Sequence, residues 1–467
     1  MPGMGAPDLV IRNAKVVTPE GVVEGGVAVS GGRIVAVGDV PGDAGRVIDA
    51  GGRWLMPGGV DPHCHIEQMS GMGVMNADTW ETATRSAAMG GTTTVVSFAA
   101  QEAGQRMAEA VADYAARAKR GAIVDHAFHM IVRDVGVPEF EADMAALIGA
   151  GHRSIKVFTT YAIKLEDVAI LRVMDAARQN GALVCVHAET DAILARAKAA
   201  LIAEGRVAPR DHAASHPRMA EIEAIERMCR FAEHLDQPLM IFHVSTAEGA
   251  EAVRRAKARG APVWAETCPH YLMMTEEVLD RPEGGKWMCS PPQRLEADQV
   301  ALWEALADGT LDLVSSDHAP YRYDATGKLS AGPDAPFHLI ANGMPGLEVR
   351  APLMFDALVT KAGAPERFAR WVAEAPAELY ALPGKGRIAE GYDADLVIWD
   401  GDRSVTYGAD DLHDNVGYNP WEGVTVTGWP EVVIQRGQVI VEDGALTAEP
   451  GQGRWIDRPA LPEEMRR

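Results

Sequence analysis

The segment 58–68, GGVDPHCHIEQ, places His63 and His65 two positions apart at the end of an apolar run. Residues two apart on a β-strand point to the same side, so both imidazoles can face one metal ion while Cys64 points into the wall. Imidazole nitrogens are common ligands of Zn²⁺ and related divalent ions. The segment therefore predicts one part of a metal site whose other ligands come from later in the chain.

Further metal-ligand candidates end later strand-like runs. His187 ends LVCVHAE, His243 ends LMIFHVS, and Asp317 lies in LDLVSSDHA. A single histidine near a strand end is more often structural than ligating, but equivalent ends of parallel strands meet at one point. We interpret the other histidines as structural or as supports for the site, among them His126, His129, His270 and His318, the last beside Asp317.

Lys156 lies inside the apolar run SIKVFTTY. A buried ammonium group is costly unless it is paired or deprotonated. Burial that lowers its pKa leaves a nucleophilic amine, which could capture carbon dioxide as a carbamate and bridge two metal ions. The alternatives are a lysine that reaches solvent or pairs with a carboxylate. The surrounding ligand candidates favour the carbamate.

Two divalent cations that share a bridging hydroxide suit hydrolysis, because they lower the pKa of water and polarise the attacked carbonyl. Asp317 is the predicted acid/base, which takes the proton of the hydroxide and passes it to the leaving nitrogen. Nitrogen and oxygen donors without thiolate favour zinc, although cobalt, manganese or nickel suit the same donors.

The elements that must position these residues alternate along the middle of the chain. Short runs rich in Val, Ile and Thr lie at 60–66, 92–99, 123–132, 154–161, 183–189, 239–245, 262–268 and 311–319. Ala-rich stretches of helical periodicity lie between them, among them 102–120, 165–180, 218–235 and 247–259. Eight alternating units over about 300 residues fit a TIM (β/α)8 barrel, whose catalytic residues lie at the carboxyl ends of the strands.

The two chain ends have a different texture, with short β-branched runs separated by glycine turns. This pattern predicts a small β-sandwich domain built from residues 1–57 plus 385–450. The α/β barrel then occupies residues 58–384, and residues 451–467 form a polar, proline-broken tail that we expect to be a surface arm.

Composition excludes several classes of protein. The 467 residues are 47% hydrophobic and 24% charged, as in soluble globular proteins, and no apolar run approaches the length of a membrane span. The net charge of −22 opposes nucleic-acid binding. The N-terminus has no secretory pattern, and the five cysteines form no CxxC pair, so we expect a cytoplasmic protein with reduced thiols.

Longer motifs resemble the cyclic amidohydrolases of the dihydropyrimidinase/hydantoinase group over nearly the whole chain. They include MPGGVDPHCHIE, SIKVFTTY, SPPQR, SSDHAP, IANGMPGLEVR and GYDADLVIWD. The resemblance implies two divalent metal ions and a homotetramer or homodimer. It implies these ligands: His63 and His65 on the first metal, carboxylated Lys156 bridging, His187 and His243 on the second, and Asp317 on the first as well as acid/base.

The resemblance also implies the substrate and the residues that hold it. Tyr161 matches a tyrosine whose hydroxyl stabilises the developing oxyanion, and Ser290 and Asn342 match residues whose backbone groups hold the amide edge of the ring. The implied reaction is hydrolytic ring opening, of dihydrouracil or a 5-substituted hydantoin, to an N-carbamoyl amino acid.

Some positions bear on the preferred substrate. Met69, Met72 and Met75 lie in a loop that resembles the one shaping the substituent pocket, and they either adapt to varied substituents or pack the loop down. Where the family usually has HTH and VFMAY, this chain has HCH and VFTTY. Neither change removes a ligand, but both alter walls near the site.

Three other functions are compatible with parts of this pattern. Dihydroorotase typically has HxHxR, but Glu67 occupies the arginine position here and would repel a substrate carboxylate. Allantoinase stays open, because allantoin is a neutral hydantoin derivative. Non-enzymatic dihydropyrimidinase-related scaffold proteins lack several of the histidines that this chain retains.

Overall fold

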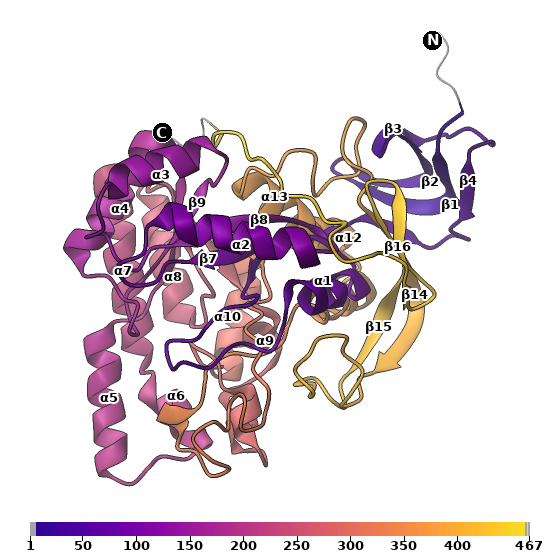
Figure 1. Ribbon diagram of the computed structural model, residues 1–467. Helices are drawn as coiled ribbons and strands as arrows, with labels where there is room; N and C mark the ends of the chain where they lie inside the picture. Colours follow the sequence, from indigo (N-terminus) through magenta and orange to yellow (C-terminus); the bar gives the residue numbers. More distant parts are fainter. Residues whose placement is uncertain (1–5, 463–464, 466–467) are drawn as a thin grey trace.

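The computed structural model of the protein describes residues 6–462 and Met465 (Figure 1). The extreme ends of the predicted β domain and of the predicted tail, residues 1–5, 463–464 and 466–467, lie outside the described residues. No helix in the described part of the chain is both long and apolar enough to cross a membrane.

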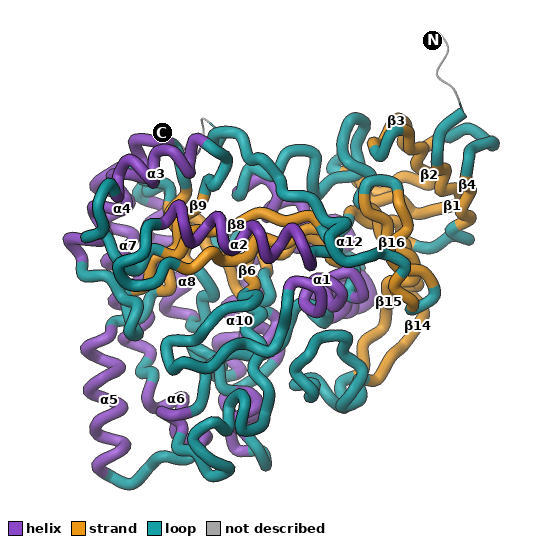
Figure 2. The backbone as a smooth tube through the Cα atoms, in the orientation of Figure 1, coloured by secondary structure: helices purple, strands orange, loops and turns teal. Residues whose placement is uncertain are grey.

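A parallel eight-stranded sheet forms the centre of the larger part of the molecule (Figure 2). Its neighbours follow chain order: β6 Gly59–Cys64, β7 Thr92–Ala100, β8 Asp125–Ile131, β9 Ser154–Phe158, β10 Leu183–His187, β11 Leu239–Ile241, β12 Val263–Thr267 and β13 Leu313–Val314. A parallel bridge between Cys64 and His318, with a 2.6 Å hydrogen bond from the His65 N–H to the His318 carbonyl, brings the first strand to the chain beyond the last. The predicted (β/α)8 barrel is confirmed.

The barrel strands are buried along nearly their whole length, as both faces of a parallel sheet must be. In β7, TTTVVSFAA, only the final alanine is exposed. Val, Ile, Thr and Phe dominate these strands because β-branched and aromatic side chains pack well on a pleated surface. Such continuous apolar runs are what made the strands recognisable in the sequence.

Helices cover the outside of the barrel. They are α1 Trp80–Met89, α2 Met107–Gly121, α3 Phe140–Gly149, α4 Asp167–Asn180, α5 Asp191–Ala203, α6 His212–Ser215, α7 Arg218–Leu235, α8 Ala247–Ala258, α9 Pro269–Met273, α10 Glu296–Ala307, α11 Arg350–Phe355, α12 Pro365–Ala369 and α13 Ala375–Leu379. The hydroxyl of Thr246 caps α8 by accepting from the Gly249 N–H. Gly181, at φ 70°, ends α4 in the left-handed conformation that glycine tolerates.

The two chain ends combine into one mixed sheet beside the barrel, at the right of Figure 1. Its strands are β1 Leu9–Thr18, β2 Gly21–Ser30, β3 Arg33–Gly38, β4 Arg46–Asp49, β5 Trp54–Pro57, β14 Leu396–Thr406, β15 Thr425–Gln435, β16 Gln438–Glu442 and β17 Ala445–Leu446. Antiparallel pairing of β5 with β14 joins the ends, and side chains of both halves share one core. We propose domain boundaries near residues 58 and 385, where the chain enters and leaves the barrel.

The expectation that the C-terminal tail is a surface arm is wrong for Ile456, Arg458, Leu461 and Met465, which are buried, whereas Arg454, Trp455 and Asp457 are exposed. Arg458 is only 1% exposed, and its guanidinium donates to the carbonyls of Gly151 and Phe128 and to the hydroxyl of Ser154. Leu461 and Met465 are also buried, against the barrel. Ser154 is the first residue of β9, so the tail covers the amino end of the barrel. The buried polar group of the tail, the Arg458 guanidinium, is satisfied there by its hydrogen bonds to carbonyls.

Candidate active site

The carboxyl end of the barrel gathers the residues that the sequence predicts as metal ligands. His63 lies in β6, Lys156 in β9, and His187 is the last residue of β10. The other three lie just beyond their strands: His65 directly after β6, His243 in the turn after β11 Leu239–Ile241, and Asp317 in the turn after β13 Leu313–Val314. All but His65 and Asp317 are buried, and those two are partly exposed.

His63, His65 and Asp317 form one half of the site. Oδ1 of Asp317 lies 3.1 Å from Nε2 of His63 and 3.6 Å from Nε2 of His65. Despite this approach, the buried Nε2 of His63 makes no hydrogen bond with any described residue. Donor atoms of His63, His243 and Asp317 lie within 4.8 Å of one another. Nitrogen and oxygen lone pairs that converge without bonding each other fit a divalent cation.

His187 and His243 form the other half. Nδ1 of His187 lies 3.0 Å from Nε2 of His243, while Nε2 of His187 lies 2.9 Å from Oε2 of Glu189. Oε1 of Glu189 is bonded to His216 at 2.8 Å. A carboxylate that accepts the Nε2–H of His187 leaves Nδ1 free to bind a metal, which is the usual support of a ligating histidine.

Lys156 lies on aromatic faces beside these imidazoles. Its Nζ is 3.8 Å from the ring centre of Phe242 and 4.8 Å from that of Phe158. His63 packs against Phe242, and His187 packs against Phe158. Lys156 is 1% exposed and forms no ion pair with a described residue. Burial lowers the pKa of Lys156 to about 7, against the pull of Asp317, so a large fraction of the amine is neutral and nucleophilic near neutral pH.

Two buried carboxylates support the histidines and were missed in the sequence. Glu266, in β12, bonds Nδ1 of His63, and Glu189 bonds His187. Burial lowers the pKa of His63, but Asp317 and Glu266 outweigh it and raise the pKa above its ordinary value. Glu266 had a usable signal, because an acid within the apolar run PVWAETC is as costly to bury as Lys156.

Left-handed backbone angles mark the turns after several strands. The φ angles are 40° at His243, 45° at Asp317 and 71° at Tyr161. Residues with a Cβ rarely adopt this region, and such strain clusters at functional sites. The turns explain why β11 and β13 are shorter than the sequence predicts, since a positive φ ends the ladder before the functional residue.

Tyr161, Ser290 and Asn342 also come together near this end. The ring of Tyr161 lies 5.2 Å from that of His187, and Nδ2 of Asn342 donates to Oγ of Ser290 at 2.9 Å. The hydroxyl of Tyr161 and Oδ1 of Asn342 are buried without a hydrogen-bond partner among the described residues. Buried polar atoms of this kind are costly, and a polar ligand would satisfy them.

The positions that differ from the usual family motifs contact the barrel wall. Cys64 is fully buried, with Sγ 3.8 Å from the Val96 carbonyl in β7. The Thr159 hydroxyl bonds backbone atoms of His187 and Glu189. Cys64 therefore packs on the middle of β7, and Thr159 holds the end of β10.

The Glu67 carboxylate is bonded at the start of α1 and is not directed at the metal-site residues. It accepts from the Trp80 N–H at the start of α1 at 2.9 Å and lies 3.9 Å from a guanidinium nitrogen of Arg117. The arginine of the dihydroorotase motif is absent at this position. The expectation that Glu67 would repel a substrate carboxylate is wrong, because its carboxylate is bonded to α1. His318 likewise bonds Asp78, at 2.9 Å, so its ring supports the loop after β6.

The methionine loop is held by other residues. Met69, Met72 and Met75 are 51%, 44% and 47% exposed, whereas Val74 is buried against Ala319 and Tyr321. This exposure argues against the interpretation that the methionines pack the loop down. They form an exposed apolar edge beside the site instead.

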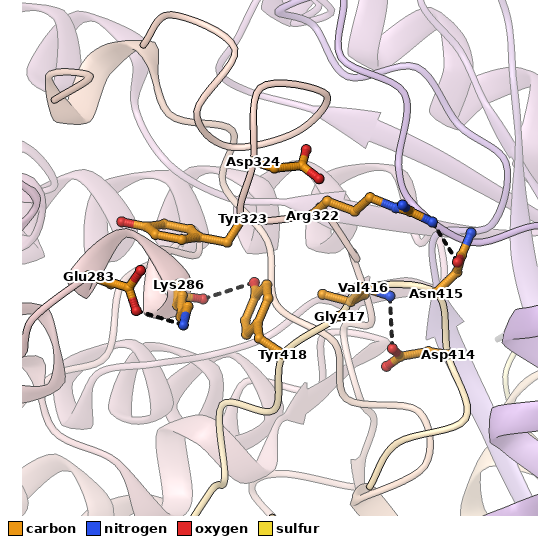
Figure 3. A pocket seen from close by; sticks show the side chains of 10 residues that line it. All are labelled: Glu283, Lys286, Arg322, Tyr323, Asp324, Asp414, Asn415, Val416, Gly417 and Tyr418. Carbon is orange, nitrogen blue, oxygen red and sulfur yellow. Dashed lines mark hydrogen bonds and ion pairs between the residues drawn. The ribbon is translucent and has the colours of Figure 1, made fainter. Parts of the chain in front are cut away.

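A cavity of about 350 Å³ lies apart from these residues (Figure 3). Lys286 lies within it, paired with Glu283 and with its carbonyl bonded by the Tyr418 hydroxyl. Arg322 donates to Asn415 across it. None of its lining residues is a candidate ligand or substrate residue. The cavity marks where the loop between β14 and β15 meets loops of the barrel.

The chain is similar to known proteins over almost its full length. Residues 54–440 match the model of the Amidohydrolase family. A D-hydantoinase of Ralstonia pickettii is 38% identical over 97% of this chain and 99% of its own. A crystal structure of dihydropyrimidinase from Brevibacillus agri NCHU1002 superimposes with a TM-score of 0.93 at 34% identity, covering 97% of this chain and 99% of that one.

An L-hydantoinase (dihydropyrimidinase) of Arthrobacter aurescens gives a TM-score of 0.88 at 29% identity, over 97% of this chain and 100% of its own. Relatives of opposite stereochemical designation thus share the fold. The family match and the near-complete coverage accord with the histidines, lysine and aspartate at the carboxyl end of the barrel. The chain belongs to the amidohydrolase family, within its hydantoinase/dihydropyrimidinase group.

Proposed function

We propose that the protein hydrolyses cyclic amides and imides, either 5-substituted hydantoins or 5,6-dihydropyrimidines, to N-carbamoyl amino acids. The observation that carries the proposal is the gathering of all six predicted ligand residues at one end of the barrel, in a chain 38% identical to a D-hydantoinase. The relatives reported above are hydantoinases and dihydropyrimidinases, so allantoinase is not favoured.

Two divalent metal ions, zinc by the nature of the donors, are the proposed cofactors. His63, His65 and Asp317 would hold one, His187 and His243 the other, and Lys156, carboxylated by carbon dioxide, would bridge them. Within residues 6–462 and Met465, the buried Lys156 amine forms no ion pair and Nε2 of His63 forms no hydrogen bond, which supports this assignment. Bound ions would lower the pKa of a water molecule and polarise the carbonyl that it attacks.

Asp317 is the proposed acid/base. Burial raises the pKa of Asp317, but His63 and His65 outweigh it and hold the pKa well below the ordinary value, so the carboxylate is ionised. It would take the proton of the attacking water and return it to the ring nitrogen as the C–N bond breaks. One residue thereby serves both halves of the hydrolysis.

Tyr161, Ser290 and Asn342 are the proposed substrate residues. The unpartnered hydroxyl of Tyr161 can donate to the carbonyl oxygen as it gains negative charge. Backbone groups of Ser290 and Asn342 would hold the –CO–NH–CO– edge that hydantoins and dihydropyrimidines share. The hydrogen bond between these two side chains keeps the holding segments together.

We also propose a cytoplasmic homotetramer or homodimer. The oligomer is inferred from the resemblance to the family. All five cysteines are buried free thiols, which supports a reducing compartment.

The test is to measure bound metal and to assay phenylhydantoin, dihydrouracil, allantoin and dihydroorotate side by side. We expect about two metal ions per chain and turnover of a hydantoin or of dihydrouracil. Turnover of dihydroorotate alone, or of allantoin alone, would overturn the substrate class. A metal-loaded protein that hydrolyses none of the four would overturn the proposed function.

A further inference from the structure

Lys328 is a second buried lysine that the proposed chemistry does not use. It is 0% exposed and lies in the long loop beyond β13. Its Nζ donates to the carbonyl oxygen of Met288 at 3.0 Å. Among the described residues it forms no ion pair, so a neutral carbonyl is its acceptor.

Lys385 shows how this chain stabilises a buried lysine that serves the fold. Its Nζ lies 2.7 Å from Asp125, 3.0 Å from Asp393 and 2.7 Å from Asp395. Three carboxylates compensate the desolvation of one ammonium group. Lys328 lacks that compensation, and burial lowers the pKa of Lys328 to about 7. Burying the Lys328 amine without a carboxylate partner costs free energy, so we expect its one hydrogen-bond acceptor to have a role.

Lys328 contacts the segment 288–290, which ends at the proposed substrate residue Ser290. Three side chains from three places in the chain each hold one of three consecutive residues. Lys328 donates to the Met288 carbonyl at 3.0 Å, Nε2 of His212 bonds the Cys289 carbonyl at 2.7 Å, and Asn342 donates to the Ser290 hydroxyl at 2.9 Å. The Gly343 N–H shares the Met288 carbonyl at 2.9 Å.

The loop that carries Lys328 is compact, so the amine is presented from a fixed base. The Lys328 N–H donates to the Arg322 carbonyl at 2.7 Å. A Cβ on the preceding residue, Gly327, would lie 2.1 Å from the same carbonyl oxygen, so only glycine permits this approach. The backbone at the base of the lysine stem is therefore held against the Arg322 carbonyl.

We propose that Lys328 is a positioning residue for the substrate, which fixes the peptide of Met288 so that the backbone of Ser290 meets the amide edge of the ring. This inference rests on the proposed function of Ser290. Lys328 does not touch the reacting atoms, and the metal-site residues do not depend on it. Its effect is expected on substrate binding, with little on metal content.

The experiment compares Lys328→Met, which keeps the length of the stem and removes the N–H donor, with Lys385→Met as the matched control. Asp125, a partner of Lys385, is the first residue of β8, so this control lies at the opposite end of the barrel. Metal content, Tm, kcat and KM are measured on the metal-loaded enzymes with the preferred cyclic substrate.

For Lys328→Met we expect kcat/KM to fall between about 10- and 100-fold, mainly through KM, with metal content unchanged. For Lys385→Met we expect a lower Tm and a KM equal to that of the wild type. A KM of Lys328→Met equal to that of the wild type would overturn the proposal. So would a loss confined to Tm, as in the control.

If Lys328→Met does not fold, Lys328→Gln takes its place, because its amide ends one bond short of the lysine amine and the Met288 carbonyl then keeps only its bond from the Gly343 N–H. Its KM should then exceed that of the wild type. Failure of both variants to fold would overturn the proposal, since the lysine would serve the whole fold. A wild-type enzyme inactive on every cyclic amide would instead show that the proposed function is wrong.

Discussion

Nε2 of His63, on the first barrel strand, lies 3.1 Å from Oδ1 of Asp317, beyond the last. Closure of the barrel creates this contact, and it is not a hydrogen bond.

Because Asp317 is proposed both to bind a metal and to carry the proton, Asp317→Asn should lower kcat by about 10²- to 10⁴-fold and reduce bound metal. Metal analysis and steady-state rates test this, with Asp113→Asn, an exposed carboxylate on α2, expected to match the wild type.

Lys156→Ala should abolish turnover and lower the metal content, because no carbamate can form. A small carboxylic acid added to the variant should restore part of the rate by occupying the place of the carbamate. Rates with and without the acid, together with metal analysis, test this. Undiminished turnover of the variant would contradict the bridging role.

Glu266→Gln should weaken metal binding by about 10- to 100-fold, because Glu266 orients His63 without itself binding the metal. Titration with a competing chelator measures the affinity. Glu348→Gln is the matched control, since this buried carboxylate bonds His413 and Ser86 instead. Equal metal affinity in the two variants would contradict the supporting role of Glu266.

Tyr161→Phe should lower kcat by about 10²- to 10³-fold and change KM little, because its hydroxyl is proposed to act on the oxyanion. Tyr380→Phe removes another buried hydroxyl that has no partner in the described part of the chain; the ring of Tyr380 packs against His129. That variant should keep its kcat. If both variants lost kcat to a similar extent, the loss in Tyr161→Phe would come from altered packing, and the proposed role of its hydroxyl would be contradicted.

Stability should fall on acidification partly through His152. Burial lowers its pKa from 6.5 to about 4, and its Nδ1 has no hydrogen-bond partner among the described residues. Because the pKa is lower in the folded state, the unfolded chain binds a proton at His152 more readily. The contribution of neutral His152 to the free energy of unfolding is therefore complete above pH 6.5 and is lost as the pH falls toward 4. At pH 5 the loss is about 2 kcal/mol.

His152→Phe should remove this part of the pH dependence, because phenylalanine fills a similar volume beside Phe128 and Trp455 without titrating. Denaturant unfolding at pH 7 and pH 5 measures it. An unchanged difference between the two pH values would show that other groups cause the acid sensitivity.

Much of the fold was readable from local patterns. Helices α7 Arg218–Leu235 and α8 Ala247–Ala258 match the predicted 218–235 and 247–259 nearly residue for residue, because amphipathic periodicity is a local property. The predicted strand 239–245 ends earlier, as β11 Leu239–Ile241, since His243 takes a positive φ. The tail was misjudged because burial of Arg458 depends on carbonyls of distant strands.

The donor residues of the site and their side of each strand follow from local sequence, because a period of two places His63 and His65 on one face of a strand in any surroundings. Long-range packing places Glu266 and Glu189 against the histidines, Glu67 against α1, and Lys328 against Met288. These relationships join residues far apart in the chain, and closure of the barrel sets their distances.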